Sequence, residues 1–128
     1  MPHIVVEYST NLEEHVAIQE MIDAVHAVAL ASGVADLPAI RVRAAPRPFY
    51  RIADGNPKHM FIHATIRLRI GRSEAAREAL GKGVLAAIET TLGAVLERET
   101  IGITVEVHEI TEMTFRRNTI RERTREKT

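Results

Sequence analysis

The chain has 128 residues, of which 45% are hydrophobic and 27% are charged, and it contains no cysteine. This length favours a single domain with its own core, and the lack of cysteine excludes disulfide bonds, thiolate metal sites and cysteine nucleophiles. The formal net charge is zero, so the overall charge gives no reason to expect nucleic acid as a partner.

The charges are arranged in blocks along the chain. Residues 1–40 carry six acids and no Lys or Arg, whereas residues 41–72 carry eight bases and one acid, a net of +7. Residues 73–110 have a net of −4 (three bases, seven acids), and residues 111–128 a net of +3 (six bases, three acids). An arginine-rich block is most often a solvated surface, and the alternative is a local site for an anion.

The first part of the chain predicts a strand, a helix and a second strand. Residues 3–8 are apolar and β-branched, which is typical of a buried strand. Asn11 and Glu14 then have the spacing of a helix N-terminal cap, and Gly33 is a natural end for that helix. A stripe at helical spacing lies between them, formed by Ile18, Met21, Ile22, Val25 and Ala29. Alternation over residues 39–44 predicts a half-buried strand, so residues 3–45 form one βαβ unit.

The second part of the chain repeats this order. Alternation over residues 60–70 predicts a strand, and Ser73 is the expected N-cap of a helix that runs to about Arg98. Residues 102–110 alternate again, which completes a second βαβ unit over residues 60–110. A connector containing proline and glycine, residues 46–58, joins the two units.

Two βαβ units predict an α+β domain over residues 1–110: a four-stranded sheet with both helices on one face. The other face is then uncovered, and its expected side chains are Thr65, Arg67, Arg69, Arg41 and Arg43. Such a face is either solvated or covered by further copies of the chain, and we expect the copies. Residues 111–128 form a basic tail or an arm on a neighbouring subunit. The N-terminus lacks the features of a secretory signal and no segment is apolar for long enough to cross a membrane, so we expect a cytoplasmic protein with no membrane partner.

Two features of the sequence could carry chemistry. The histidines His59, His63 and His108 could form a metal site, but separate polar roles are the commoner outcome, and we expect no metal. Pro2 directly precedes a core strand, and removal of Met1 would leave a secondary amine there. Burial and nearby cations favour the neutral form of an amine, which is then a competent general base. Many chains have proline at position two by chance, so the residue alone decides nothing.

Several short motifs, taken in order, resemble the tautomerase superfamily and, within it, the 5-carboxymethyl-2-hydroxymuconate isomerase family. The similarity extends from Pro2 to about Glu109, and it is carried by Met1-Pro2-His3, Ile40-Arg41-Val42-Arg43, Ala53-Asp54-Gly55, Phe61-Ile62-His63 and Gly71-Arg72-Ser73. The resemblance implies a homotrimer and a cofactor-free isomerisation of a small polycarboxylate, 5-carboxymethyl-2-hydroxymuconate, in homoprotocatechuate degradation.

The resemblance also implies the roles of individual residues. Pro2 would be the general base, and Arg41 and Arg72 would bind carboxylates and stabilise the developing negative charge. Arg43 and His63 would line the substrate site. Two alternatives stay open: another reaction of the superfamily, a phenylpyruvate-type tautomerase or a dehalogenase, or a non-catalytic trimeric module that binds an acidic partner.

Overall fold

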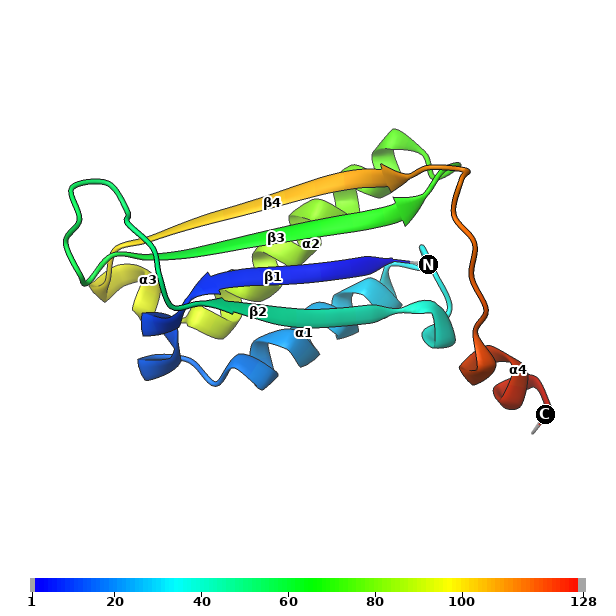
Figure 1. Ribbon diagram of the computed structural model, residues 1–128, viewed down its shortest axis with the longest axis horizontal. Coiled ribbons are helices and arrows are strands. Elements are labelled where there is room, and N and C mark those ends of the chain that lie inside the picture. Colours follow the sequence, from blue (N-terminus) through cyan, green and yellow to red (C-terminus); the bar gives the residue numbers. More distant parts are fainter. Residues whose placement is uncertain (1, 127–128) are drawn as a thin grey trace.

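The computed structural model describes residues 2–126, which fold around one four-stranded mixed sheet (Figure 1). The strand order is β2-β1-β3-β4. β1 pairs in parallel with β2 and β3 pairs in parallel with β4, while the central pair β1 and β3 is antiparallel. The strands are β1 (His3–Ser9), β2 (Arg41–Arg47), β3 (Met60–Arg69) and β4 (Ile101–Ile110).

Two long helices lie side by side and cover the same face of the sheet (Figure 1). They are α1 (Ile18–Ala31) and α2 (Glu74–Leu92). The predicted α+β fold of two βαβ units with both helices on one face is therefore confirmed. The shorter helical elements are η1 (Thr10–Glu14), η2 (Leu37–Ala39), α3 (Val95–Arg98) and α4 (Thr119–Glu126). Within residues 2–126, no helix has both the length and the apolar character needed to cross a membrane.

The core fills the space between the sheet and these two helices. Alternate side chains of β1 and β3 point into it, and Ile4, Val6, Ile62 and Ile66 are almost completely buried. The helices supply the opposite wall of the core with Met21, Val25, Leu80, Val84 and Ile88. Strand alternation in the sequence thus fixes which side chains remain on the open face of the sheet.

The first helix starts later than the sequence predicts. Residues 10–14 form a short 3-10 turn, and α1 begins only at Ile18. The Asn11 side chain makes no cap; its Nδ2 donates to the carbonyl oxygens of Pro57 and His59, at 3.2 and 2.8 Å. Asn11 therefore anchors the connector between β2 and β3, and this long-range contact replaces the predicted N-terminal cap.

The C-terminal segment packs against the rest of its own chain in this structure. After β4, residues 111–118 pass the N-terminal end of β1, and α4 then lies against η2 (Figure 1). α4 carries basic side chains and little apolar surface, so polar contacts rather than burial hold it in place.

Candidate active site

The N-terminal end of β1 lies at the same end of the sheet as the C-terminal ends of β3 and β4 (Figure 1). Pro2 is buried there, and its carbonyl oxygen accepts a hydrogen bond of 3.2 Å from the Arg41 amide. In the sheet register, His3 lies opposite Arg67 on β3. The antiparallel central pair thus brings arginines from the end of β3 to the first residues of β1.

A pocket of about 510 Å³, here called the His3 pocket, opens beside the first residue of β1. Its ten lining residues include four arginines, one carboxylate and two isoleucines. It is lined by His3, Arg43, Arg67, Arg69, Ile70, Ile110, Thr111, Glu112, Thr114 and Arg116. Such a lining suits a small anion with an apolar carbon chain.

The positive field of this pocket acts directly on His3. Partial burial, and then the charges of Arg43, Arg41 and Arg67, lower the pKa of the His3 imidazole below its ordinary 6.5. Arg43 Nη1 lies 3.2 Å from His3 Nδ1, and because a guanidinium can only donate, Nδ1 must be the unprotonated nitrogen. His3 is therefore neutral at neutral pH, and any basic group beside it experiences the same cationic surroundings.

We expect this lowered pKa to make His3 a source of acid sensitivity. In the unfolded chain the imidazole titrates near 6.5, so the unfolded chain binds more protons than the folded one below that pH. Stability is thus lost as the pH falls through 6.5 towards the folded pKa. The free energy of unfolding, measured by urea titration between about pH 5 and 7.5, should depend less on pH in His3→Gln. Equal slopes for the two proteins would contradict this expectation.

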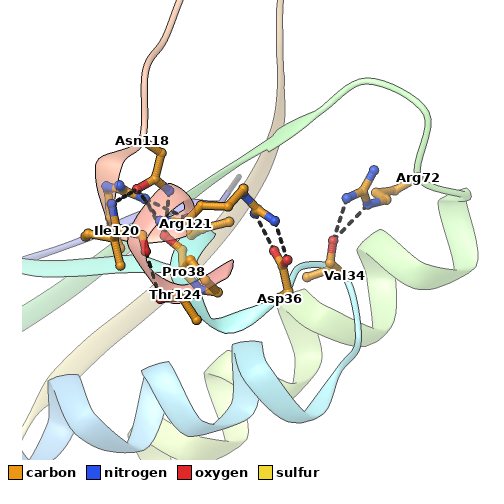
Figure 2. Close-up of polar contacts among 10 residues, drawn as sticks. Val34, Asp36, Pro38, Arg72, Asn118, Ile120, Arg121 and Thr124 are labelled. Atoms are coloured by element: carbon orange, nitrogen blue, oxygen red, sulfur yellow. Dashed lines mark hydrogen bonds and ion pairs between the residues drawn. The ribbon is translucent and has the colours of Figure 1, made fainter. Parts of the chain in front are cut away.

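A second pocket of about 470 Å³, here called the Arg72 pocket, adjoins the His3 pocket and shares Arg69 and Arg116 with it. The Ser73 hydroxyl accepts from the Ala76 amide at 3.1 Å and caps α2, as predicted, which fixes Arg72 in the preceding turn. Arg72 donates from Nε and Nη2 to the Val34 carbonyl oxygen, at 3.0 and 2.6 Å (Figure 2). These bonds use two of its five N–H groups and leave three for a ligand. The lining is Gly33, Val34, Ala35, Asp36, Ala39, Arg69, Arg72, Arg116, Asn118 and Arg121.

The C-terminal helix holds the segment between α1 and β2, which forms one wall of the Arg72 pocket. Both Nη atoms of Arg121 contact the Asp36 carboxylate, and Asn118 Nδ2 donates to the Pro38 carbonyl oxygen at 2.8 Å (Figure 2). The same segment binds Arg41, whose Nη1 donates to the Ala39 and Pro38 carbonyl oxygens at 3.0 and 3.4 Å. Residues 34–39 thus connect α4 to Arg41 and Arg72, the two arginines for which the family resemblance implies carboxylate binding.

We expect Arg121→Ala to release α4 with little change in global stability. The Arg121 side chain is 31% exposed and that of Asp36 59%, so the pair should contribute at most about 1 kcal/mol to the free energy of unfolding. Amide hydrogen exchange over residues 119–126 should nevertheless become faster, because the contact that holds this helix is lost.

Arg123→Ala, which changes an exposed arginine of the same helix, is the matched control. The exchanged pair, Asp36→Arg with Arg121→Asp, should restore protection. Unchanged exchange in Arg121→Ala would show that other contacts hold α4.

The structure separates the predicted site residues of a single chain. Arg43 lines the His3 pocket and Arg72 lines the Arg72 pocket, whereas Arg41 lines a third pocket between β2 and α1. His63 lines none of these cavities. It lies on the open face four residues before Arg67, and its Nε2 is 2.5 Å from Glu106 Oε1.

Two of the histidines considered for a metal site share one carboxylate, and the third makes other contacts. His63 shares Glu106 with His108, at 2.5 and 2.7 Å, and hydrogen bonds from His108 and then His63 hold the pKa of that carboxylate below its usual range. His59 instead contacts Asp54 and Thr100, at 2.9 and 2.6 Å. Among residues 2–126, no group of three or more His, Cys, Asp or Glu side chains is placed to hold a metal ion.

Three further arginines at this end of the sheet had no role in the sequence-based site. Arg67 and Arg69 were predicted only as side chains of the uncovered face, and Arg116 only as part of the basic tail. The pairing of β1 with β3 brings the first two beside His3, and the returning C-terminal segment adds Arg116. The only feature of the sequence that pointed to them was the close spacing of Arg67 and Arg69 within the arginine-rich block of residues 41–72.

Comparison with known proteins agrees with this architecture. The model of the 5-carboxymethyl-2-hydroxymuconate isomerase family matches residues 2–124. The chain belongs to this family. Its similarity to the Escherichia coli 5-carboxymethyl-2-hydroxymuconate Delta-isomerase is 27% identity over 121 residues, covering 94% of this chain and 96% of that protein. Family membership confirms the predicted resemblance, and with it the expectation of a tautomerase-superfamily enzyme of the isomerase class.

Solved structures share the fold. A 5-carboxymethyl-2-hydroxymuconate isomerase from Deinococcus radiodurans R1 superimposes with a TM-score of 0.88 and 28% identity, over 96% of this chain and 93% of that chain. A fused 4-OT wild-type symmetric trimer superimposes with a TM-score of 0.66 and 18% identity, over 88% of this chain and 89% of that chain. At that identity the trimer shows the fold alone.

Proposed function

We propose that the protein isomerises 5-carboxymethyl-2-hydroxymuconate without a cofactor, as a step of homoprotocatechuate degradation. The observation that carries the proposal is that two arginine-lined pockets lie at the end of the sheet where Pro2 directly precedes β1. Such a cationic site matches a substrate with three carboxylates, and the family of the chain supports the choice of substrate.

In the proposed reaction, the nitrogen of Pro2, freed by removal of Met1, is the base. Met1 itself lies outside the described residues. The amine takes the proton of the 2-hydroxyl group, the C2–O bond becomes a carbonyl, and the two C=C bonds shift to a single C3=C4 bond. A proton is then delivered from the ammonium to carbon five, so atoms and charge balance and no oxidant or reductant is needed.

The surroundings of Pro2 favour this role. A neutral amine is required at the start of the reaction, and neighbouring positive charges stabilise the neutral form of a base. Partial burial and then the charges of Arg43, Arg41 and Arg67 lower the pKa of the adjacent His3, so these cations lie near Pro2 as well. As charge moves onto the dienolate, the free N–H groups of Arg72 stabilise it.

The proposal gives binding roles, rather than proton transfer or stabilisation of the dienolate, to Arg41, Arg43 and His63. Arg43 belongs to the His3 pocket and binds a substrate carboxylate. Arg41 lies on the edge strand β2, and His63 on the open face, so both would act where a second copy covers those surfaces.

We propose a homotrimer for the assembly. The open face of the sheet carries partly buried apolar side chains, Val5 and Phe61, among charged and polar ones, and a further copy would remove them from water. The fused 4-OT symmetric trimer has the same fold. Light scattering on the eluting protein should give three times the mass of one chain.

An ultraviolet assay of ketonisation tests the proposed activity. The purified protein should consume 5-carboxymethyl-2-hydroxymuconate far faster than phenylpyruvate or 3-haloacrylates. Faster turnover of phenylpyruvate or release of halide would instead assign one of the other superfamily reactions. No turnover of any enol, together with salt-sensitive capture of an acidic protein, would favour the binding module.

A further inference from the structure

The two pockets at the Pro2 end of the sheet form one cationic surface. They share Arg69 and Arg116, and together they contain six arginines (Arg43, Arg67, Arg69, Arg72, Arg116 and Arg121) but only two carboxylates, Asp36 and Glu112. The net charge of the combined lining is therefore +4. Like charges held this close repel one another, so the arrangement is stabilised when an anion enters.

Three of the six arginines already have partners within the chain. Arg72 donates to Val34, Arg121 pairs with Asp36, and Arg43 contacts His3. Within residues 2–126, no hydrogen bond or ion pair is formed by the side chains of Arg67, Arg69 and Arg116. Arg69 and Arg116 are exposed and come from different segments, the end of β3 and the stretch before α4. Their N–H groups are thus available at the junction of the two pockets.

We propose that Arg69 and Arg116 form a carboxylate-binding site that recognises the carboxymethyl group of the substrate. The inference rests on the proposed function, in which Arg43 binds a substrate carboxylate and Arg72 stabilises the charge of the dienolate. A branch carboxylate needs cations at a third place, and the junction between the two pockets supplies them. Ile70 and Ile110 line the His3 pocket beside this junction and give the carbon chain apolar contacts. Arg116 is therefore a specificity-determining residue, contributed by the C-terminal segment.

Two substrates that differ by one carboxylate test the inference. Steady-state kinetics are measured on 5-carboxymethyl-2-hydroxymuconate and on 2-hydroxymuconate, which lacks the carboxymethyl group. The measured ratio is kcat/KM for 5-carboxymethyl-2-hydroxymuconate divided by kcat/KM for 2-hydroxymuconate. In Arg116→Ala this ratio should fall about tenfold, because one hydrogen bond to a charged group is lost. Arg116→Lys keeps the charge and should recover part of the ratio.

Arg117→Ala is the matched control. Arg117 is the next residue, its side chain is 79% exposed and pairs with Glu122, and it lines neither pocket. The substrate ratio should stay at the wild-type value in this variant. An equal loss on both substrates in Arg116→Ala, or a ratio no different from that of Arg117→Ala, would overturn the inference.

A binding measurement separates this inference from the proposed reaction. Calorimetric titration with tricarballylate, a stable tricarboxylate, needs no turnover, and the affinity should fall in Arg116→Ala but not in Arg117→Ala. A wild-type protein that turns over neither muconate would overturn the proposed function while the titration still decides the carboxylate site. Equal affinity of all three proteins for tricarballylate would reject the site.

Discussion

Inserting one alanine between Met1 and Pro2 is expected to lower kcat for ketonisation by about 10²–10⁴-fold, the usual contribution of a positioned general base. Removal of Met1 from the insertion variant leaves alanine at the N-terminus, so the Pro2 nitrogen becomes an amide. An amide nitrogen is not basic at neutral pH, and the first proton transfer then has no acceptor. The pyrrolidine ring and its burial are left as they are in the wild type.

One further variant and two control measurements are needed to interpret this result. Pro2→Ala keeps an α-amino group after Met1 removal, so its loss of kcat should be smaller than that of the insertion variant. Mass spectrometry must show which N-terminus each protein carries, and equal melting temperatures must show that both fold. A fully active wild-type protein that retains Met1, or a fully active insertion variant, would remove Pro2 from the mechanism.

Local sequence pattern was sufficient for most of the fold. Alternation in residues 60–69 correctly separated the core side of β3, including Ile62 and Ile66, from its open side. The cap at Ser73 was also correct, because a helix N-cap depends on residues only three positions apart. Strand faces and helix caps of this kind can therefore be predicted from neighbouring residues without knowledge of any tertiary contact.

The start of α1 shows where local rules fail. Asn11 and Glu14 have the spacing of a capping box, yet Asn11 binds two carbonyl oxygens of the connector, 46 and 48 residues along the chain. An asparagine side chain can accept a hydrogen bond from a nearby backbone N–H group, as in a cap, or donate one to a distant carbonyl oxygen. Only the folded chain decides which of these groups are within reach.

The candidate site could be predicted only in part for the same reason. Pro2 and Arg72 lie in recognisable motifs, and both lie at the same end of the sheet. Arg69 and Arg116 belong to no motif. They lie close together only because of the antiparallel register of β1 and β3 and the return of residues 111–118 across this end of the sheet. Neither the sheet order nor that return can be read from residue spacing within one element.

Replacing Arg72 by alanine is expected to lower kcat/KM by about 10²–10³-fold, the usual cost of removing one preorganised donor to a developing oxyanion. The loss should fall on kcat as well as on KM, because the charge that Arg72 stabilises is larger in the transition state than in the bound substrate. Arg72→Lys restores one positive charge but not the planar fork, so it should recover only part of kcat.

Arg72 also supports the wall of its own pocket, and the experiment must separate that role from catalysis. Loss of the guanidinium leaves the Val34 carbonyl oxygen without its donor, which should cost about 1 kcal/mol of unfolding free energy. Urea unfolding of Arg72→Ala measures this cost directly, and Arg98→Ala, an exposed arginine of α3 at the opposite end of the sheet, is the control. If kcat of Arg72→Ala stays near the wild-type value while its stability falls, Arg72 is a structural residue of the segment that joins α1 to β2, and the oxyanion must be stabilised by another arginine.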